Sequence, residues 1–537
     1  MKYHRYYSPL STAQSQPIPG REAEMARNEA GGYVFSASDW ERLERFLILG
    51  AEDGYYAKAP ELTIQNAQAL LRCLLADGQK VVNMIVDVSV NGRAPKNEAA
   101  IFALAMASSP KLADKATNSL ALAVLPKVAR TGTYLFQFVE AAQAMRGWGR
   151  SLREAVSNWY NGKSPENLAY QLTKYRQRGG WTHRDVLRLA HPLPASPIHD
   201  MLFRWTTKGA VPEVGDLTAY IRAFESVQKA ENPATAAAII EAHRLTWEMV
   251  PTTLLKQPVV WEALLEHIPY TALLRNLNRL TAIGVIKPLG EWTETIATQL
   301  AEQVSKTRPP IHPIALLNTL AVYQQGHGEK GSLKWDPARE IVDALNEAFY
   351  AAFKNVQPTG KRILLALDVS GSMSAKAEGS FLEARQIEAA MALVTASVEP
   401  KWHIVGFTNR VHPLSISPHQ RLDDVLRAMP REMEGTDCAV SIQYALDKGL
   451  DVDAIVQYTD NQTWAGQEHT VQTLEKYRQK VGHPIKIVAA ATAAYEAAIL
   501  DPKDPDSLNI VGWDSAAPAV ISQFLGAVAA PSSAEED

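Results

Sequence analysis

Apolar residues follow a helical pattern through the first two-thirds of the chain. They recur every three or four positions in segments such as WERLERFLILGA, NAQALLRCLLADG and TALLRNLNRLTAIG. Short breakers that contain Gly, Pro or Asn separate these segments up to about Phe353. The rhythm predicts antiparallel helix pairs stacked as a HEAT-like solenoid, whose repeat is about 40–47 residues long. A globular helical bundle is the alternative.

The pattern changes after Phe353 to an alternation of strands and helices. Short apolar runs bounded by polar or turn residues occur in RILLALDVS, WHIVGFTN, AIVQYTDN, IKIVAAAT and LNIVGWD. Helical stretches such as EARQIEAAMALVTASV and TVQTLEKYRQKVG lie between them. This order predicts a parallel, doubly wound α/β domain. The segment VQPTGK, Val356 to Lys361, is the predicted boundary, which gives a helical domain at 1–355 and an α/β domain at 356–537.

Composition agrees with a multidomain cytoplasmic protein. The 537 residues exceed what one hydrophobic core usually serves. No run approaches the roughly 20 apolar residues of a membrane span, and the start, MKYHRYYSPL, lacks the apolar core of a signal peptide. Cys73 and Cys438 are the only cysteines, which excludes a disulfide framework or a thiolate metal cluster. We therefore expect a reduced, cytoplasmic location and no membrane partner.

Charge divides the chain in the same way as the hydrophobic pattern. From Val356 onward there are 15 Lys/Arg and 24 Asp/Glu, a balance of −9. The preceding residues hold the other 39 basic and 34 acidic side chains, a balance of +5. The split favours two separate domains, of which the N-terminal one is basic. Chance variation between surfaces is the alternative.

Oxygen-bearing side chains gather at predicted strand ends of the α/β domain. Asp368 ends the first strand, and Ser370 and Ser372 follow it in LLALDVSGSMS; Thr436 precedes a helix in MEGTDCA, and Asp460 ends the strand of AIVQYTD. Ligands of doubly wound sheets bind beyond the carboxyl ends of the strands. Carboxylates and hydroxyls are the ligands that a hard cation prefers, which predicts Mg²⁺, with Mn²⁺ as the alternative. Helix capping by the two serines is the simpler reading.

The order D-x-S-x-S, then Thr, then Asp resembles the metal-ion-dependent adhesion site of von Willebrand factor A domains. Asp368, Ser370, Ser372, Thr436 and Asp460 fill all five positions of that motif. A nucleophilic serine is disfavoured, because G-x-S-x-G is absent and no histidine follows a late strand. A phosphate-binding loop of the form G-x-x-x-x-G-K-[ST] is also absent.

The most basic and aromatic segment runs from Arg146 to Pro192. Nine basic side chains stand there against three acidic ones, and Trp and Tyr residues are interleaved with them. Lys174 and Arg178 are four residues apart, so they would share one face of a helix, and we expect their long side chains to reach solvent. Some rings must be core anchors. The remaining surface would suit RNA, with cations on phosphates and rings or guanidinium groups against unpaired bases; a merely solvated helical face is the alternative.

The same segment carries a family resemblance. RGWGRSLREAVSNWY and TKYRQRGGWTHRDVLRLAHP resemble the TROVE domain of the Ro autoantigen family. The likeness continues in LERFLILGAEDGYYA, HIPYTALLRNLNRLTAIGVI and IHPIALLNTLAVYQQGHGEKGSLKWDP, and a von Willebrand A domain follows in the family's order. The resemblance, with the alanine-rich composition, indicates a bacterial Ro protein.

For this family the resemblance implies a closed ring of HEAT-like repeats held shut by the A domain. It also implies Y RNA on the outer basic surface, single-stranded 3′ ends of misfolded or defective RNAs in the central hole, and a 3′-exoribonuclease reached through RNA. Lys174, Arg178 and His191 match the family's Y RNA contacts by motif. Four further phosphate contacts are expected on charge alone: Arg150, Arg153, Arg184 and Arg188.

We therefore expect a nonenzymatic RNA-binding scaffold in the quality control, processing or decay of noncoding RNA. The rival class is a protein-adhesion module that acts through the metal site. A metallonuclease is a third reading, but one metal in an acidic domain does not supply the paired ions typical of phosphodiester hydrolysis.

Overall fold

The structure is a computed structural model that describes residues 11–36, 38–49, 59–94, 97–211, 216–307, 310–328, 332–377, 380–492, 497–511, 513 and 517–526. The first ten residues, which carry the signal-peptide argument, lie outside these ranges. So do residues 50–57 of the motif LERFLILGAEDGYYA. Among the described helices, none has the length and apolar content that a bilayer crossing requires.

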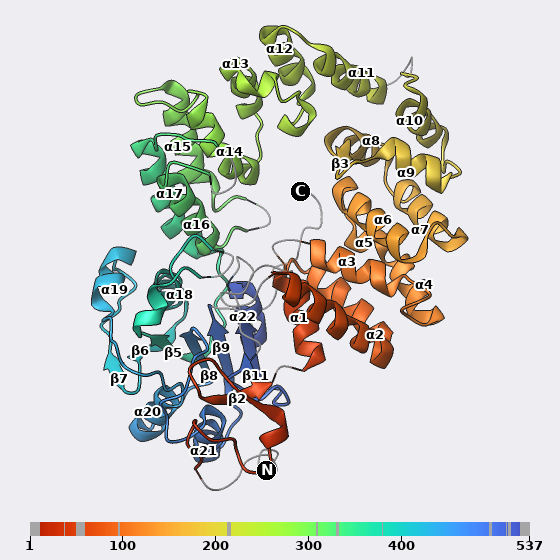
Figure 1. Ribbon diagram of the computed structural model, residues 1–537. Helices are drawn as coiled ribbons and strands as arrows, with labels where there is room; N and C mark the ends of the chain where they lie inside the picture. Colours follow the sequence, from red (N-terminus) through yellow and green to blue (C-terminus); the bar gives the residue numbers. More distant parts are fainter. Residues whose placement is uncertain are drawn as a thin grey trace.

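In the described part of the N-terminal region there are 17 α-helices, which follow a curved path whose two ends meet the α/β domain (Figure 1). The predicted all-α ring is confirmed. Neighbouring helices pack against each other, among them α1 with α2, α3 with α6, and α16 with α17. Their bounds are α1 Asp39–Leu49, α2 Ala59–Val90, α3 Glu98–Ala107, α4 Lys115–Ala123, α5 Leu125–Val128, α6 Gly132–Arg146, α7 Arg150–Asn161, α8 Pro165–Lys174, α9 His183–Ala190, α10 Pro197–Lys208, α11 Asp216–Lys229, α12 Pro233–His243, α13 Pro258–Leu265, α14 Tyr270–Ala282, α15 Glu291–Gln303, α16 Pro313–Gln324 and α17 Arg339–Ala351.

Local sequence fixes where these helices begin. The side chains of Asp114, Thr131, Ser164 and Ser196 accept backbone N–H groups at the starts of α4, α6, α8 and α10. Proline occupies the first turn of α8, α10, α12, α13 and α16, where a missing N–H costs nothing. Each start therefore combines a polar cap or a proline with an apolar face that packs against the next helix.

The long helix α2 is interrupted where it meets α4. Asp77 leaves the helical conformation, with φ −159° and ψ 86°, and its Oδ1 accepts the N–H of Lys80 at 2.9 Å. At the next position, a Cβ on Gly78 would lie 2.3 Å from Thr117 Oγ1. Glycine is therefore required there, because α4 approaches the backbone too closely for any side chain.

The C-terminal domain is a six-stranded sheet in the order β11-β9-β8-β5-β6-β7, with helices on its faces (Figure 1). All five predicted strands are present and run parallel. The predicted doubly wound α/β domain is confirmed, and a sixth strand that was not predicted, β7, pairs antiparallel with β6 at one edge. This strand is a three-residue return, too short for the apolar pattern to reveal. The bounds are β5 Arg362–Asp368, β6 Lys401–Phe407, β7 Val411–Pro413, β8 Ala454–Thr459, β9 Lys486–Ala491, β11 Ser507–Val511, α18 Ala384–Val398, α19 Leu422–Ala428, α20 Val440–Lys448, α21 Thr470–Val481 and α22 Ala517–Leu525.

Strand β5 is buried on both faces, which explains its unbroken apolar run. Ile363, Leu365 and Leu367 join the core that extends through α18 into the helical ring. Leu364 and Ala366, on the other face, pack into a separate core with residues of α20 and α21. One face of the sheet thus shares its core with the ring.

Residues 11–36 pack against the α/β domain, although they stand first in the chain. Strand β2 (Tyr33–Ser36) pairs with β1 (Met25–Arg27) on one side and with β10 (Ala497–Ala498) on the other, both antiparallel. Arg21 donates from Nη1 to Asp501 Oδ2 at 2.7 Å. Gln14 is fully buried and accepts from the hydroxyl of Thr463 at 2.7 Å. The predicted helical domain therefore begins with a segment that lies on the other domain, and the boundary after residue 355 stays a prediction.

The other end of the helical path contacts the α/β domain through polar groups as well. Ser380 Oγ, just before α18, donates to Asn318 Oδ1 of α16 at 2.7 Å. The N–H of Leu422 donates to the hydroxyl of Tyr350 in α17 at 2.9 Å, and the Arg421 guanidinium lies 4.0 Å from the centre of the Tyr350 ring. Both ends of the path thus rest on one domain.

We predict that Arg21→Ala destabilises the α/β domain by roughly 3 kcal/mol, because Asp501 would stay buried after losing its guanidinium partner. Denaturant unfolding of the full chain measures the change. The control is Arg339→Ala, which removes an ion pair to Asp343 whose side chains are both largely exposed and which should matter little. Equal unfolding curves for the two variants would contradict this role of Arg21.

Candidate metal site and RNA-binding surface

The five predicted metal ligands come from three neighbouring loops at one edge of the sheet. Asp368 is the last residue of β5, and Ser370 and Ser372 lie in and beside the short 3-10 turn Gly371–Ser374 that follows. Asp460 directly follows β8, which is the parallel neighbour of β5, so the two carboxylates leave the same edge. Thr436 lies on the loop before α20, and its carbonyl accepts the N–H of Trp464 at 3.0 Å.

Hydrogen bonds connect these ligands. The hydroxyls of Ser370 and Ser372 are 3.0 Å apart and share a hydrogen bond, and Ser372 also hydrogen-bonds Asp460. The carboxylate of Asp368 accepts the N–H of Ser370 at 3.0 Å and the hydroxyl of Thr459 at 2.9 Å. Thr459 was not predicted from the sequence, although it directly precedes Asp460. These bonds tie the loop after β5 to the end of β8 around Asp368.

The electrostatics of the site favour a cation. Burial raises the pKa of Asp368, and the nearby charge of Asp460 raises it further. Burial also raises the pKa of Asp460. Two buried carboxylates repel each other unless a positive charge neutralises them. The donor set of two carboxylates and three hydroxyls consists only of hard oxygens, which fits Mg²⁺ or Mn²⁺; in the described ranges no cluster of three or more His, Cys, Asp or Glu side chains offers a different metal site.

A third acid that the sequence analysis missed lies behind Asp368. Glu388 of α18 is fully buried, and within the described ranges its carboxyl oxygens make at most a weak contact with the backbone of Asp368. Burial, and then the charge of Asp368, raise the pKa of Glu388 well above its usual value. The signal was the single acid, Glu388, within the apolar run of IEAAMALV.

Two large apolar side chains stand exposed on the loops of the metal site. Met433 is 92% exposed on the loop that carries Thr436, and Trp464 is 46% exposed on the loop that follows Asp460. A Cβ on Gly371 would lie 2.8 Å from the Met433 sulfur, so Met433 lies against the serine turn. The edge therefore combines oxygen ligands with an apolar rim.

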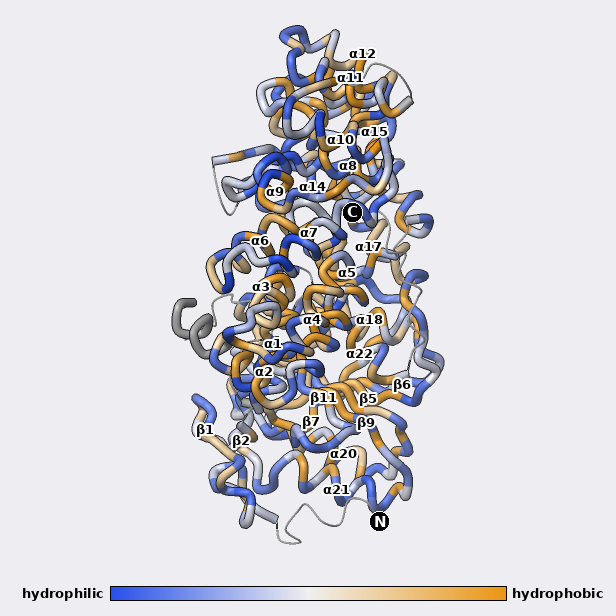
Figure 2. Tube along the Cα trace, turned by 90° about the vertical axis from the view of Figure 1, so that its right-hand side faces the viewer, coloured by the Kyte–Doolittle hydropathy of each residue, from blue (hydrophilic) through white to orange (hydrophobic). Residues whose placement is uncertain are grey.

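The basic segment forms a second candidate site on the outer side of the helical ring, which Figure 2 views directly. Arg150 and Arg153 are exposed on α7, and Arg184 and Arg188 are exposed on α9. His191 is exposed at the C-terminus of α9, in the left-handed conformation with φ 49°. Helices α7 and α9 pack against each other, so these five side chains belong to adjoining elements.

The expectation that Lys174 and Arg178 share a helix face is wrong. Helix α8 ends at Lys174, and Arg178 lies in the strand β3 (Gln177–Arg178), which pairs with β4 (Trp181–Thr182). Gly179 and Gly180 between these strands have φ values of 57° and 84°, which glycine adopts readily. The pair of glycines in QRGGW was the overlooked turn signal. Arg178 is exposed on this hairpin.

Lys174 does not extend into solvent as expected. Its side chain is only 12% exposed, and Nζ donates to the hydroxyl of Tyr170 at 2.8 Å and lies 3.7 Å from a carboxylate oxygen of Glu248. Burial by itself would lower the pKa of Lys174, but the hydrogen bond to Tyr170 and the charge of Glu248 outweigh it and raise the pKa. Lys174 therefore holds α8 to the segment around Glu248.

The aromatic residues of the basic segment divide between core and surface. Trp159 and Tyr160 are fully buried, and the Tyr160 hydroxyl shares a hydrogen bond of 2.8 Å with His183 Nδ1. Trp148, Tyr175 and Trp181 are half-buried. The rings of Trp159 and Tyr160 are therefore core anchors, as the sequence predicted for some of these aromatic residues.

Comparison with known families identifies both parts of the chain. A family model described as the TROVE domain matches residues 26–243, 241–321 and 318–361, and one described as the Ro60 vWA domain matches residues 362–525. The chain belongs to the Ro60 family of RNA-binding proteins. Among its Ro relatives, the RNA-binding protein RO60 of Deinococcus radiodurans is 37% identical over 97% of this chain and 98% of that protein.

Two further comparisons agree. The RNA-binding protein RO60 of Caenorhabditis elegans is 35% identical over 93% of this chain and 89% of that protein. The crystal structure of the Deinococcus radiodurans RO (RSR) protein matches with a TM-score of 0.77 at 38% identity, over 91% of this chain and 99% of that chain. The helical ring with a von Willebrand A domain is therefore the Ro architecture, and the chain is a bacterial Ro orthologue.

We predict that Asp368→Ala removes Mg²⁺ and Mn²⁺ binding, because the site loses the carboxylate around which its loops are tied. Isothermal titration calorimetry with each ion measures this. Asp447→Ala, which removes an exposed acid from α20 of the same domain, is the control and should bind as the unaltered protein does. Retention of full affinity by Asp368→Ala would rule out this metal site.

Proposed function

We propose that this Ro protein is a nonenzymatic scaffold that binds Y RNA on the outer surface of its ring and takes single-stranded 3′ ends of misfolded or precursor RNAs into the central hole. It acts in the cytoplasm, in the quality control, processing or decay of noncoding RNA. The observation that carries the proposal is the set of four exposed arginine side chains on α7 and α9, within a family whose relatives are named RNA-binding proteins.

The surface suits the phosphates of a structured RNA. The side chains of Arg184 and Arg188 stand one turn apart on α9, with Arg150 and Arg153 on the neighbouring α7. Exposed guanidinium groups contact phosphates without reading sequence, and each contact releases counterions, so binding should weaken steeply as salt rises. Arg178 and His191 extend the surface at the β3–β4 hairpin and at the end of α9. Lys174 supports this surface indirectly, because its buried contacts hold α8 in place.

The metal site has a separate task. Asp368, Ser370, Ser372, Thr436 and Asp460 would hold Mg²⁺, or Mn²⁺ in its place, and the bound ion would supply a positive charge for an oxygen ligand of a partner. No RNA step depends on it. A 3′-exoribonuclease joins the complex through the bound RNA.

A second candidate function is protein adhesion through that metal. The exposed Met433 and Trp464 favour it, because an apolar rim beside a cation suits a protein side chain that ends in a carboxylate. Both activities can coexist, since the outer surface of the ring and the metal edge lie on different domains.

The proposal predicts that the double substitution Arg184→Ala with Arg188→Ala weakens binding of a structured RNA at least tenfold at moderate salt and reduces the salt dependence, with little effect on stability. Filter binding at several salt concentrations measures both quantities. Lys174→Ala is the contrasting variant: it should lower the free energy of unfolding by about 2 kcal/mol, because it breaks a buried hydrogen bond of a charged group. RNA binding unchanged by the double substitution would overturn the assigned surface.

A further inference from the structure

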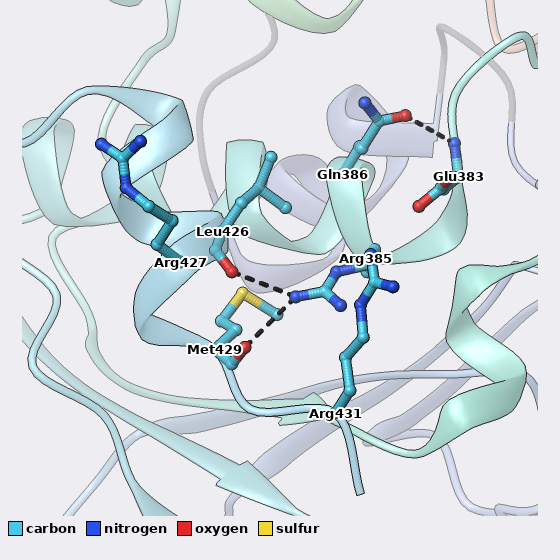
Figure 3. A pocket seen from close by; sticks show the side chains of 7 residues that line it. All are labelled: Glu383, Arg385, Gln386, Leu426, Arg427, Met429 and Arg431. Atoms are coloured by element: carbon cyan, nitrogen blue, oxygen red, sulfur yellow. Dashed lines mark hydrogen bonds between the residues drawn. The ribbon is translucent and has the colours of Figure 1, made fainter.

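A pocket that the metal site does not use lies between α18 and α19. Its volume is about 510 Å³, within the range of small-molecule sites. Figure 3 shows its lining: Glu383, Arg385, Gln386, Leu426, Arg427, Met429 and Arg431. Three of these seven side chains are arginines. The pocket is therefore cationic, although more of its lining surface is apolar than polar.

Arg385 is a fixed cation in the wall of the pocket. Its residue is only 7% exposed, and Nη2 donates to the carbonyl oxygens of Leu426 at 3.1 Å and Met429 at 3.2 Å. These carbonyls belong to the last turn of α19 and the residue that follows it, where a cation is favoured. The other guanidinium nitrogens of Arg385 make no hydrogen bond within the described part of the chain, so they stay available for a ligand.

A second guanidinium approaches the first. Arg431 extends from the segment after α19 until its guanidinium lies beside that of Arg385 (Figure 3). Like charges held together in this way repel each other, and a bound anion relieves the repulsion. The third cation, Arg427, pairs with Asp424 outside the pocket.

The acidic groups nearby do not neutralise the pocket. Glu383, at the N-terminus of α18, is the one acidic residue in its lining, against three arginines, and its charge acts on Arg385. Glu388 also acts on Arg385, but it is fully buried behind Asp368. Two guanidinium groups thus face the space with free donors.

We propose that this pocket binds the phosphoryl group of a nucleotide. Guanidinium groups present paired N–H donors that match the oxygens of phosphate, and two of them on one dianion make a strong, oriented site. The size accommodates a nucleoside monophosphate, either free or at the end of an RNA strand. Because the relatives are named RNA-binding proteins, the terminal phosphate of an RNA is one source of such a ligand.

The pocket and the metal edge share one segment of chain. Arg431 directly precedes Glu432, whose N–H donates to the carbonyl of Val369 at 3.0 Å, between Asp368 and Ser370. Met433, on the apolar rim, follows. A ligand in the pocket would therefore contact the loop that supports the serine ligands of the metal.

Calorimetry with the full-length protein tests the proposal. Inorganic phosphate and adenosine 5′-monophosphate are the probes, and short RNAs of one sequence with 5′-phosphate, 3′-phosphate or no terminal phosphate distinguish a free nucleotide from an RNA end. Arg431→Gln removes an exposed cation from the pocket and should fold normally. Lys448→Gln, an exposed cation at the end of α20, is the matched control.

We expect saturable binding of adenosine 5′-monophosphate that Arg431→Gln weakens at least tenfold and Lys448→Gln leaves unchanged. Tighter binding of one phosphorylated RNA than of its unphosphorylated form, lost in Arg431→Gln, identifies an RNA end as the source. No saturable binding of either probe, equal affinity in Arg431→Gln, or preference for an acidic peptide over the nucleotide would overturn the proposal. The Arg184→Ala with Arg188→Ala variant should retain nucleotide binding, which separates this outcome from failure of the outer RNA surface.

Discussion

The docking of both ends of the helical path on one α/β domain is the constraint on which the rest of the molecule depends. Stacked helical repeats leave apolar faces at their ends, and these faces must be covered. Here the N-terminal segment adds β2 to β10, while α16 and α17 contact the α/β domain through Asn318 and Tyr350. The core of the ring continues through α18 to one face of β5. The A domain therefore has a structural role, which is to join the two ends of the helical path, in addition to any role in binding.

This joint also determines where chemistry can occur. One face of the sheet is covered by elements that continue into the ring, so the open edge at the carboxyl ends of β5 and β8 is left for ligands. The acids gather there, with Glu388 packed behind Asp368. The exposed arginines lie on α7 and α9, far along the chain on the helical path. The acidic metal site and the basic outer surface of the ring thus lie on different domains, in agreement with the charge split of the sequence.

Much of the fold could be predicted from the sequence because its signals are local. Apolar runs with polar boundaries predicted the five parallel strands. The order of Asp, Ser, Ser, Thr and Asp predicted that three loops distant in sequence contribute to one site. The predictions that failed concern contacts between residues distant in sequence, or elements of only a few residues. Strands β1, β2 and β7 have three or four residues, too few for a period to appear. The place of residues 11–36 against the last domain has no local signature at all.

The errors at the RNA surface have similar causes. Two residues four apart share a face only while a helix continues. Helix α8 ends at Lys174, and Arg178 directly precedes the turn at Gly179 and Gly180, so the two side chains do not lie on one helix. The burial of Lys174 depends on Glu248, which is 74 residues away in the chain and invisible to a helical wheel. The exposure of the arginines was predicted more reliably, because each long side chain can reach solvent without any contact to a residue distant in sequence.

The proposal that single-stranded 3′ ends enter the central hole predicts that the protein discriminates between the two ends of a strand, and competition binding tests this most directly. Two hairpins of identical stem and loop carry the same single-stranded extension, one at the 3′ end and one at the 5′ end. Stacking along a channel contributes about 1–3 kcal/mol for each well-stacked base, so a few nucleotides suffice for a clear difference. The account predicts that the 3′-extended hairpin binds more tightly. Equal affinity for the two hairpins would contradict it.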